Sequence, residues 1–345
     1  MQKNVRILVT GAGGRLAEYL IPLLHKKGYS LNFLDYNAER VRERFKKQMA
    51  FLAPGEDATA APTKARLFQA NLAKGDPDDL TQIDKACKEC DCVVHLAALV
   101  DYNAPRKNVF AVNVNGTKRV LDAAKRAGAK RFVFASSTSV YRSPCYLPVD
   151  EKHPVAPANA YGQSKAEAEK LVRASGIPYV ILRFALVYGP GFEEGFRFVA
   201  EQIKEGKMVL IGSGENRIAF VHASDAAQAL LLAIERREAV NRDFIIASDE
   251  SITQEQALRA IADALGVKPP DKRVFKELAY AGAHFSQLKR RVGLGSGSLS
   301  PENVGTLAED RWYDVTKART VLGFEARVKF EDGLNEFLSS LEKKS

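Results

Sequence analysis

The first half of the chain alternates short apolar runs with longer amphipathic segments. This alternation predicts βαβ units around a parallel sheet, because each crossover helix covers a face of the sheet that its two strands join. Six apolar runs and five amphipathic segments match a doubly wound dinucleotide-binding sheet. The predicted strands cover residues 5–10, 30–35, 65–70, 92–97, 131–136 and 179–184, and the predicted helices cover residues 14–27, 38–52, 77–88, 109–127 and 158–175.

The regular alternation ends near residue 186, and beyond it helical patterns persist while strand patterns become short and scattered. We therefore predict an α/β protein, a Rossmann-type doubly wound parallel sheet with a smaller, mostly helical C-terminal cap that binds the substrate. The sheet domain would contain residues 1–185, with 218–248 returning to it, and the cap residues 186–217 and 249–345. Residues 53–64 are predicted to form a surface insertion, and the later helices residues 196–205, 223–236, 254–265 and 330–341, with turn clusters at 212–214 and 293–301.

Composition excludes several classes of protein. Of the 345 residues, 46% are hydrophobic and 27% are charged, which is ordinary for a globular chain. No apolar run approaches the roughly 20 residues that cross a bilayer, and the first residues lack the layout of a secretory signal, so we expect a cytoplasmic protein. The net charge of +9 favours an anionic ligand. Nucleic acid is a disfavoured partner, because the basic residues are spread along the chain.

Three of the four cysteines, Cys87, Cys90 and Cys92, form a CxxCxC cluster. A zinc site needs four ligands, and neither a second pair nor a nearby histidine completes this one. Cys92 also falls inside a predicted strand. We therefore interpret the cluster as buried or neutral thiols and expect no metal.

A glycine cluster lies directly between the first predicted strand and the first predicted helix, with the spacing Gly11-x-x-Gly14-x-x-Ala17. Glycine allows backbone N–H groups to approach a pyrophosphate closely, and the helix N-terminus adds favourable partial charge. The spacing differs from GxGxxG, but the strand before it and the helix after it are the context that a nucleotide site requires. The turn therefore predicts dinucleotide binding.

Asp35 ends the second predicted strand, about 20 residues past the glycines. A carboxylate at this point binds both ribose hydroxyls and repels a 2′-phosphate, which predicts NAD rather than NADP. Arg40 and Arg42 could still accommodate NADP. An alternative role for Asp35 is the N-cap of the helix that begins at Ala38.

Tyr161 and Lys165 begin a strongly helical segment, and their i, i+4 spacing places both side chains on one helix face. A nearby cation favours the phenolate and would move the tyrosine pKa from about 10 towards neutrality, with help from an oxidised nicotinamide. Such a phenolate can take a proton from a carbinol while hydride leaves the same carbon. The sequence thus predicts an acid–base pair.

Tyr313 and Lys317 show the same spacing, so position must separate the two pairs. Tyr161 follows a strand that ends in the hydroxyl-rich residues 136–139, which could bind the reacting oxygen at the carboxyl edge of the sheet. Tyr313 has no such strand near it and is interpreted as surface helix packing. The alternative for residues 136–139 is a polar turn that closes the strand.

Together these motifs resemble the extended short-chain dehydrogenase/reductase family, also called NAD-dependent epimerase/dehydratase. The resemblance spans nearly the whole chain and includes Thr10–Ala17, Asp35, His95–Ala98, Asn113–Thr117, Ser136–Tyr141, Tyr161–Lys165, Tyr188–Gly191, Phe220–His222, Asp225, Asp314–Arg319 and Leu322–Phe324. It implies that Ser137 polarises the substrate oxygen, that Tyr161 is the base and that Lys165 binds the ribose. The cofactor-binding positions that it implies are Gly11, Gly14, Arg15, Leu16, Asp35, Asn71, Leu72, Leu96, Ala97, Ala98 and Asn113, together with Tyr161 and Lys165, around NAD.

Two departures from the family pattern concern the substrate. Sugar-nucleotide epimerases usually have Asn at the position of Leu186 and Arg at the position of Ile218, and both contact the diphosphate. Arg217 lies one residue earlier and would point to the opposite strand face. The chain is therefore more similar to the 3β-hydroxysteroid-dehydrogenase-like and dihydroflavonol-reductase-like branches, which act on one carbinol–carbonyl centre.

Residues 272–292 combine basic residues with apolar ones at helical spacing, namely Phe275, Leu278, Ala279, Gly282 and Phe285. This segment is interpreted as an ordinary cap helix packed on the core. The alternative is a helix that lines an apolar substrate pocket or touches a membrane surface.

Three functions remain open from the sequence. The first is an NAD(P)-dependent oxidoreductase for a hydroxysteroid-like, flavonoid-like or glycosyl substrate. The second is a sugar-nucleotide 4-epimerase or dehydratase that keeps its NAD bound. The third, disfavoured because Ser137, Tyr161 and Lys165 are all present, is a dinucleotide-sensing module. The family resemblance also implies a homodimer.

Overall fold

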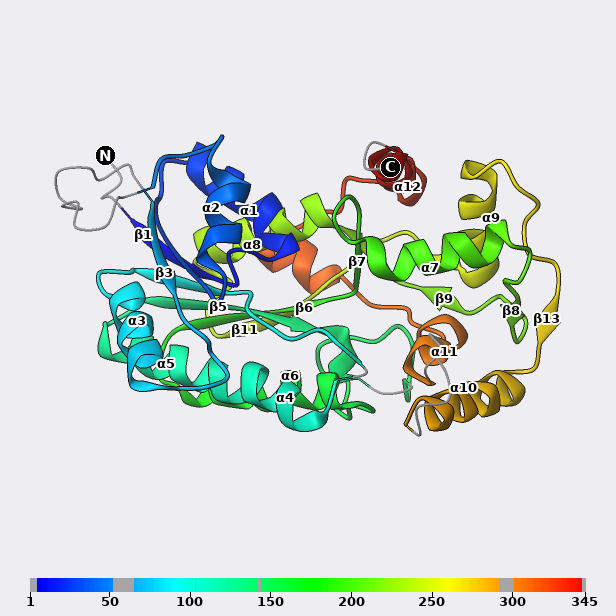
Figure 1. Cartoon of the computed structure of the whole chain (residues 1–345), viewed down its shortest axis with the longest axis horizontal. Helices are drawn as coiled ribbons and strands as arrows, with labels where there is room; N and C mark the ends of the chain where they lie inside the picture. The colour runs from blue at the N-terminus through cyan, green and yellow to red at the C-terminus, as the bar shows by residue number, and fades with distance from the viewer. Residues whose placement is uncertain (1–4, 52–64, 103, 142–143, 292–300, 343–345) are drawn as a thin grey trace.

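The computed structural model describes residues 5–51, 65–102, 104–141, 144–291 and 301–342. A seven-stranded parallel sheet with helices on both faces forms the larger part, and a smaller lobe lies beyond the carboxyl ends of its strands (Figure 1). The residues predicted as an insertion, 53–64, and the turn residues 293–300 lie outside the described residues.

The strand order of the sheet is β3-β2-β1-β4-β5-β6-β11. The order reverses between β1 and β4, and in doubly wound sheets ligands bind at the carboxyl ends of the strands that flank such a reversal. The strands are β1 (Arg6–Thr10), β2 (Ser30–Asp35), β3 (Arg66–Gln69), β4 (Cys92–His95), β5 (Arg131–Ser137), β6 (Tyr179–Phe184) and β11 (Arg242–Ile246).

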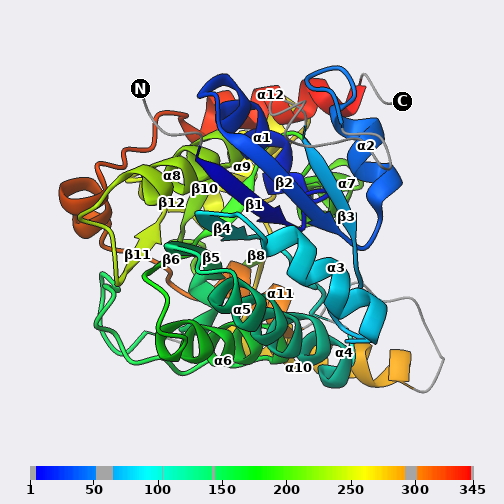
Figure 2. The ribbon, with the colours of Figure 1, turned by 90° about the vertical axis from the view of Figure 1, so that its left-hand side faces the viewer.

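Two layers of helices cover the sheet (Figure 2). On one face α1 packs against α8, which also contacts β5 and β6; on the other, α5 packs against α3 and α6. The helices of this part are α1 (Arg15–Lys26), α2 (Ala38–Phe45), α3 (Pro77–Cys87), α4 (Arg106–Phe110), α5 (Thr117–Arg126), α6 (Ala160–Ala174) and α8 (Ala223–Glu235).

Strand β5 shows why both faces are covered. Phe132 and Phe134 are buried in the hydrophobic cluster on the α3–α5 side, whereas Val133 and Ala135 are buried in the cluster on the α1–α8 side. Alternate side chains of a strand point to opposite faces, so an apolar run needs a cover on both. The continuous apolar runs of the sequence are therefore strands of a sheet buried on both faces.

The smaller lobe has its own hydrophobic core, built around Phe196, Phe220, Phe330 and Phe337. Its elements are β7 (Leu186–Tyr188), α7 (Glu193–Lys204), β8 (Leu210–Ile211), β9 (Arg217–Ile218), β10 (Phe220–His222), β12 (Ile252–Thr253), α9 (Gln254–Ala264), β13 (Arg273–Val274), α10 (Lys276–Arg291), α11 (Pro301–Ala308) and α12 (Phe330–Glu342). The strands pair only two by two, as β7–β10, β8–β13 and β9–β12.

The six predicted strands are present, with ends that differ by two residues or fewer, and β11 adds a seventh. The helix predicted over residues 38–52 ends at Phe45 instead, because Phe51 pairs with Ala65 in an isolated bridge beside the sheet. The helix predicted over residues 109–127 is wider in its middle: a π-helical segment, η1 (Ala111–Gly116), separates α4 from α5. Such π-helical turns are rare and favour functional sites. A second one, η3 (Ala318–Leu322), packs against β11 and α8.

Helix α10 presents most of its predicted apolar stripe to solvent. Phe275, just before the helix, is 82% exposed, and Leu278 and Phe285 are also exposed. The helix packs instead through Ala283, which lies with Val304 and other residues of α11 in a small buried cluster. The expected packing of the apolar stripe on the core is therefore wrong for these three residues. Over the described part of the chain, the helices are all too short or too polar to cross a membrane.

Replacing Phe132 by Ala removes a fully buried ring from the α3–α5 side of the sheet. We expect the free energy of unfolding to fall by about 3–5 kcal/mol, because the lost transfer energy adds to the cost of the cavity. Urea denaturation measures this loss. Phe275→Ala is the matched control, and its exposed ring predicts a change within about 0.5 kcal/mol. Equal losses in the two variants would contradict the placement of the core.

Candidate active site

The glycine turn joins β1 to α1 at the carboxyl edge of the sheet. Gly11 has φ +68°, and a Cβ built on it would lie 2.7 Å from the Cα of Ala97. Gly14 donates its N–H to the Gly11 carbonyl at 2.8 Å, and its own Cβ would lie 2.9 Å from that oxygen. Neither position has room for a side chain, so bare backbone faces the entrance to α1, where the helix dipole favours an anion. Arg15 and Leu16 follow in the first turn of α1 and are half-buried.

Asp35 lies beside this turn, at the end of β2. Its Oδ2 accepts the N–H of Gly13 at 2.9 Å, and its Oδ1 accepts the N–H of Asn37 at 3.0 Å. Arg40 pairs with the same Oδ1 at 3.4 Å. The alternative role as an N-cap is wrong, because the Asn37 side chain caps α2 by accepting the N–H of Arg40. Asp35 instead holds the glycine turn through Gly13 and pairs with the guanidinium of Arg40.

Of the two arginines considered for NADP, only Arg40 lies at Asp35. The guanidinium of Arg42 lies over the ring of Phe51, 5.5 Å from its centroid. A third arginine, Arg44, reaches the turn from α2 and donates to the carbonyl of Gly13 at 2.9 Å. Sequence reasoning did not single out Arg44, although its position one turn after Arg40 places the two on one helix face.

The predicted adenine residues follow β3. Asn71 uses its amide oxygen locally, accepting the N–H of Ala73 at 2.9 Å, and its backbone N–H donates to Asp79 at 2.8 Å. Leu72 is buried against Gly116 of η1, where a Cβ would lie 2.9 Å from that of Leu72. Leu96, Ala97 and Ala98 form the half-buried segment after β4, next to the glycine turn.

A buried histidine connects the end of β1, just before the glycine turn, to the start of α5, just after η1. His95 ends β4 with no exposed surface; its Nδ1 lies 2.7 Å from the hydroxyl of Thr10 and its Nε2 lies 2.9 Å from that of Thr117. The hydroxyl of Thr117 donates its hydrogen to the carbonyl of Asn113, so it can only accept from His95. Nε2 of His95 therefore carries the ring hydrogen, and Nδ1 accepts from Thr10. Burial, and then the charge of Lys165, lower the pKa of His95 to about 3, so the ring is neutral.

Asn113 extends this chain of hydrogen bonds to the helix of Tyr161. Its Nδ2 donates to the hydroxyl of Ser164 at 2.9 Å, and Ser164 donates to the carbonyl of Tyr161 at 2.7 Å. Its Oδ1 accepts the N–H of Leu99 at 2.7 Å. Sequence reasoning placed Asn113 near this helix but missed His95, Thr117 and Ser164 as members of one network. Polar residues inside or directly after apolar segments were the available signal.

The three residues predicted to do the chemistry meet at the end of β5. Tyr161 is buried, and the hydroxyl of Ser137 lies near enough to its phenol to oppose the rise of its pKa. Lys165 is 3% exposed, donates to the carbonyl of Ala135 at 2.7 Å, and holds its ammonium 5.8 Å from the centroid of the Tyr161 ring. A hydroxyl, a phenol and a cation are thus gathered at the carboxyl edge, beside the reversal of strand order.

Local structure fixes this meeting. Asn159 caps α6 by accepting the N–H of Gly162 at 2.8 Å, so the helix begins just before Tyr161. A Cβ at Gly162 would overlap the carbonyl oxygen of Ser139, which shows how closely α6 approaches the chain after β5. The glycine of the Tyr-Gly-Gln-Ser-Lys motif is therefore required by packing.

The side chains around Tyr161 do not by themselves lower the pKa of its phenol in the way that the sequence predicted; in the structure this pKa is raised. Burial is the largest influence and raises the pKa of the phenol, Tyr102 adds to the rise, and the Ser137 hydroxyl opposes it. Burial lowers the pKa of Lys165 to about 8, against the opposing charge of Glu169. The protein by itself therefore keeps Tyr161 protonated. The sequence shows the neighbouring cation, but it does not show the burial that removes water from the phenol and raises its pKa.

The interpretation of Tyr313 as surface helix packing is wrong. Tyr313 forms a bridge with Val149, and its phenol lies near Thr138, the residue directly after Ser137. Lys317 points away from it, with its ammonium over the ring of Phe244 at 5.3 Å. The pair thus supports the end of β5 without bringing phenol and ammonium together.

The lobe side of the site differs from what a diphosphate would need. Leu186 is 41% exposed at the start of β7, and Ile218 is buried in the core of the lobe. Arg217, on the other face of β9, lies over the ring of Trp312 at 4.2 Å and pairs with Asp310. Neither position offers a free polar group of the kind that the epimerase pattern places there.

The cysteines make no compact ligand set. Cys87, Cys90 and Cys92 are buried, and Cys90 donates to the carbonyl of Ala86 at 3.2 Å. Burial raises the pKa of Cys90 and of Cys92 to about 12 in each case, so these thiols are neutral.

Residues 7–247 match the model of a family described as "NAD dependent epimerase/dehydratase family". A protein of Methanocaldococcus jannaschii, whose name gives UDP-glucose 4-epimerase as an inferred activity, is 32% identical over 250 residues, which are 68% of this chain and 75% of that protein. An Arabidopsis thaliana 3beta-hydroxysteroid-dehydrogenase/decarboxylase is 26% identical over 96% of this chain, which spans only 61% of that longer protein. The fold resembles the crystal structure of a Thermotoga maritima UDP-glucose 4-epimerase, with a TM-score of 0.73, 21% identity and 99% of both chains covered.

Replacing Gly11 by Ala tests the glycine turn. The new Cβ would clash with Ala97 and sit at φ +68°, so we expect NAD affinity to fall by a factor on the order of 100, or about 2.8 kcal/mol. Gly28→Ala is the matched control, because Gly28 has φ +79° but open space around its Cα. It should lose about 1–2 kcal/mol of stability and keep its affinity. Isothermal titration with NAD compares the two, and equal affinities would contradict a cofactor site at this turn.

Proposed function

The chain belongs to the NAD-dependent epimerase/dehydratase family, and we propose that it transfers hydride between NAD and the carbinol or carbonyl carbon of a small organic substrate. The family makes it an NAD-dependent enzyme, a dehydrogenase, reductase or epimerase of the extended short-chain type, as the motifs of the sequence indicated. The observation that supports the proposal most strongly is that Ser137, Tyr161 and Lys165 lie together at the carboxyl end of β5.

Each of the three side chains has a distinct role in the proposal. Ser137 holds and polarises the substrate oxygen, and Tyr161 exchanges a proton with that oxygen through its Oη. The phenol is protonated in the protein by itself, which is the form that donates to a carbonyl; removal of a proton from a carbinol needs added positive charge. Lys165 supplies one such charge and binds the ribose. NAD, when bound, supplies the hydride acceptor or donor.

The residues of the turn fit a dinucleotide, because the turn presents its backbone at the N-terminus of α1 and its glycines pack too closely on Ala97 and on each other to carry side chains. Asp35 is proposed to bind the adenosine ribose, and Arg40 beside it partly offsets its charge. The further cofactor contacts that we propose are Gly11, Gly14, Arg15, Leu16, Asn71, Leu72, Leu96, Ala97, Ala98, Asn113, Tyr161 and Lys165.

The lobe favours a substrate without a diphosphate. Leu186 exposes an apolar side chain, Ile218 is buried, and Arg217 is occupied by Trp312 and Asp310. A hydroxysteroid-like or flavonoid-like molecule fits these surroundings better than a sugar nucleotide, because it needs no anchor for two phosphates. The Arabidopsis relative is named for activity on a hydroxysteroid.

The alternative is a sugar-nucleotide 4-epimerase or dehydratase. The M. jannaschii relative, at 32% identity, favours this reading. Such an enzyme keeps NAD tightly bound and returns the hydride to the substrate, so Ser137, Tyr161 and Lys165 would have the same roles. The two functions differ in their products: a dehydrogenase releases reduced cofactor, whereas an epimerase releases only the altered sugar nucleotide.

The proposal includes the organisation of the chain. Residues 1–185 with 218–248 bind the cofactor, and residues 186–217 with 249–345 cover the substrate. Two copies would pair through the helices α5 and α6, which lie in the outer layer on one face of the sheet (Figure 2). We also propose a cytoplasmic location for the protein. We do not propose that α10 contacts a membrane surface.

Replacing Tyr161 by Phe removes the proton donor and keeps the ring. We expect kcat to fall by a factor of about 10²–10⁴, the usual contribution of a positioned acid or base, while NAD affinity changes little. Tyr29→Phe is the matched control, because the Tyr29 hydroxyl bonds Glu235 at the amino end of β2. Steady-state kinetics and NAD titration measure both effects. Full activity in Tyr161→Phe would refute the proposed chemistry.

A substrate panel separates the two functions. With NAD and hydroxysteroids or flavonoids, a dehydrogenase accumulates reduced cofactor, which its absorbance reports. With UDP-hexoses, an epimerase interconverts the sugars without net NADH and purifies with bound NAD. We expect net NADH from an apolar carbinol and none from a UDP-hexose, and sugar interconversion alone would replace the main proposal by the alternative.

A further inference from the structure

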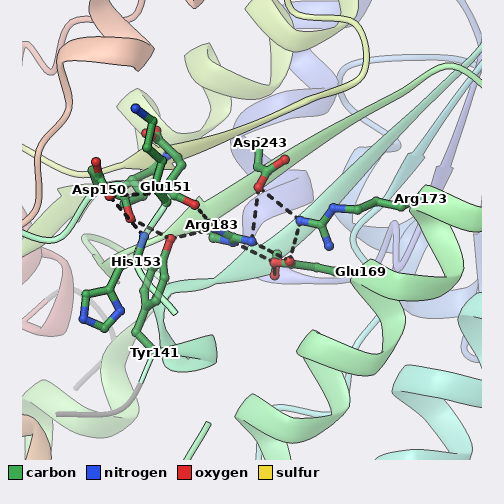
Figure 3. A network of polar contacts seen from close by, with 11 residues as sticks. Tyr141, Asp150, Glu151, His153, Glu169, Arg173, Arg183 and Asp243 are labelled. Carbon is green, nitrogen blue, oxygen red and sulfur yellow. Dashed lines mark hydrogen bonds and ion pairs between the residues drawn. The ribbon is translucent and has the colours of Figure 1, made fainter. Parts of the chain in front are cut away.

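A fully buried acid lies one helical turn beyond the proposed site. Glu169 follows Lys165 by four residues on α6, so the two side chains share a helix face, and Glu169 is 1% exposed. Its Oε1 accepts from the hydroxyl of Ser136 at 2.6 Å and from Nε of Arg183 at 2.9 Å, and its Oε2 accepts from Nη2 of Arg183 at 2.8 Å (Figure 3). Arg173 also reaches Oε2, at 2.9 Å, from the surface side.

Arg183 holds Glu169 in a two-point ion pair within the sheet. It lies on β6 opposite Ser136 of β5, and it is 2% exposed. Its Nη1 donates to the hydroxyl of Tyr141 at 2.6 Å, and its Nη2 also lies 3.2 Å from Asp243 of β11. Every nitrogen of this guanidinium therefore has an acceptor, and the pair links α6 to three strands and to the chain after β5 (Figure 3).

Such a pair is poorly explained by stability alone. Moving two charges out of water costs about as much as their attraction returns, so apolar side chains of the same volume would serve the sheet as well. Ser136, which donates to Glu169, immediately precedes Ser137, and Lys165 precedes Glu169 by one turn. The pair thus lies directly behind two of the three residues to which the proposed chemistry is assigned.

We propose that Glu169, held by Arg183, is a positioning residue that keeps the Lys165 side chain charged and in place beside Tyr161. The inference rests on the proposed function for its consequence in catalysis, but its physical content concerns Lys165 alone. Glu169 touches neither substrate nor cofactor in this proposal. It acts through the amine one turn away.

The other groups around Lys165 do not replace this carboxylate. On α6, Tyr161 is neutral; on β4, His95 is neutral; from β5 come the carbonyl of Ala135 and the ring of Phe134. Tyr102 packs on Tyr161 from the segment after β4. Glu169 is the charged group that opposes the lowering of the Lys165 pKa by burial.

The charge of Glu169 is itself secured. Burial acts to raise the pKa of Glu169, but the hydrogen bonds and charge of Arg183 outweigh it and leave that pKa below its ordinary value. Burial acts likewise to lower the pKa of Arg183, and the carboxylate reverses this effect. Both partners therefore remain ionised, and a neutral amide at position 169 would remove the anion without moving the backbone.

Glu169→Gln is the test. In the variant we expect Lys165 to lose its proton at a pH at least about one unit lower than in the parent protein, a tenfold change in proton affinity. NMR of protein carrying ¹³Cε-labelled lysine follows this titration without substrate or cofactor, and Lys165→Met assigns the resonance. Glu167→Gln is the matched control on the same helix, because Glu167 is paired with the exposed Lys170 at 2.8 Å. It should leave the titration of Lys165 unchanged.

An unchanged Lys165 titration in folded Glu169→Gln overturns the inference. If that variant fails to fold, Glu169→Gln combined with Arg183→Gln removes both charges. The double variant should lower the Lys165 titration by less than about one unit, because loss of the guanidinium offsets part of the loss of the carboxylate that opposes burial at that amine. A value at or above the parental one overturns the inference.

Turnover supplies the second readout. The alkaline decline of kcat/KM should move to lower pH in Glu169→Gln and stay in place in Glu167→Gln. A shifted Lys165 titration in a protein with no NAD-dependent turnover supports the positioning role and refutes the proposed function. A shifted turnover profile with an unshifted Lys165 titration overturns the positioning role and leaves the proposed function intact.

Discussion

The close seating of α6 against the carboxyl end of β5 is the constraint on which the rest of the site depends. Lys165 bonds the carbonyl of Ala135, and Gly162 leaves no space between the helix and the chain at Ser139. Because the helix cannot slide along the strand, the phenol of Tyr161 remains near the hydroxyl of Ser137. The buried network of His95, Asn113 and their partners holds the same helix from the side of the glycine turn. The position of the Tyr161 phenol is therefore fixed by two independent sets of contacts, one with the end of β5 and one through Asn113.

Much of the sheet could be predicted because its strands are buried on both faces. A short continuous apolar run such as 131–136 is typical of a parallel strand buried on both faces. Segments with clear helical periodicity separate it from the neighbouring apolar runs. The glycine turn was equally readable, since its meaning depends on the strand before it and the helix after it. These are local signals, and the fold preserves them.

What the sequence could not supply depends on contacts between distant residues. Strands of two or three residues, such as β9, have no period to read. The π-helical segment depends on Asn113, which bonds α6 and the chain after β4 at once. Arg183 stands in an apolar strand with no visible reason until Glu169 is placed beside it. The Tyr161 pKa shows the same limit, because burial raises the pKa of this phenol and the i, i+4 spacing does not reveal that burial.

The pairing of Asp35 with Arg40 has a consequence for how this site could diverge. The acid and the guanidinium lie 3.4 Å apart at the end of β2, and Arg44 stands one turn further along α2. Loss of the one carboxylate would leave a basic surface that already contains its arginines. Under the proposed role of Asp35, a change of dinucleotide preference in this chain would require a deletion of charge rather than a new binding group.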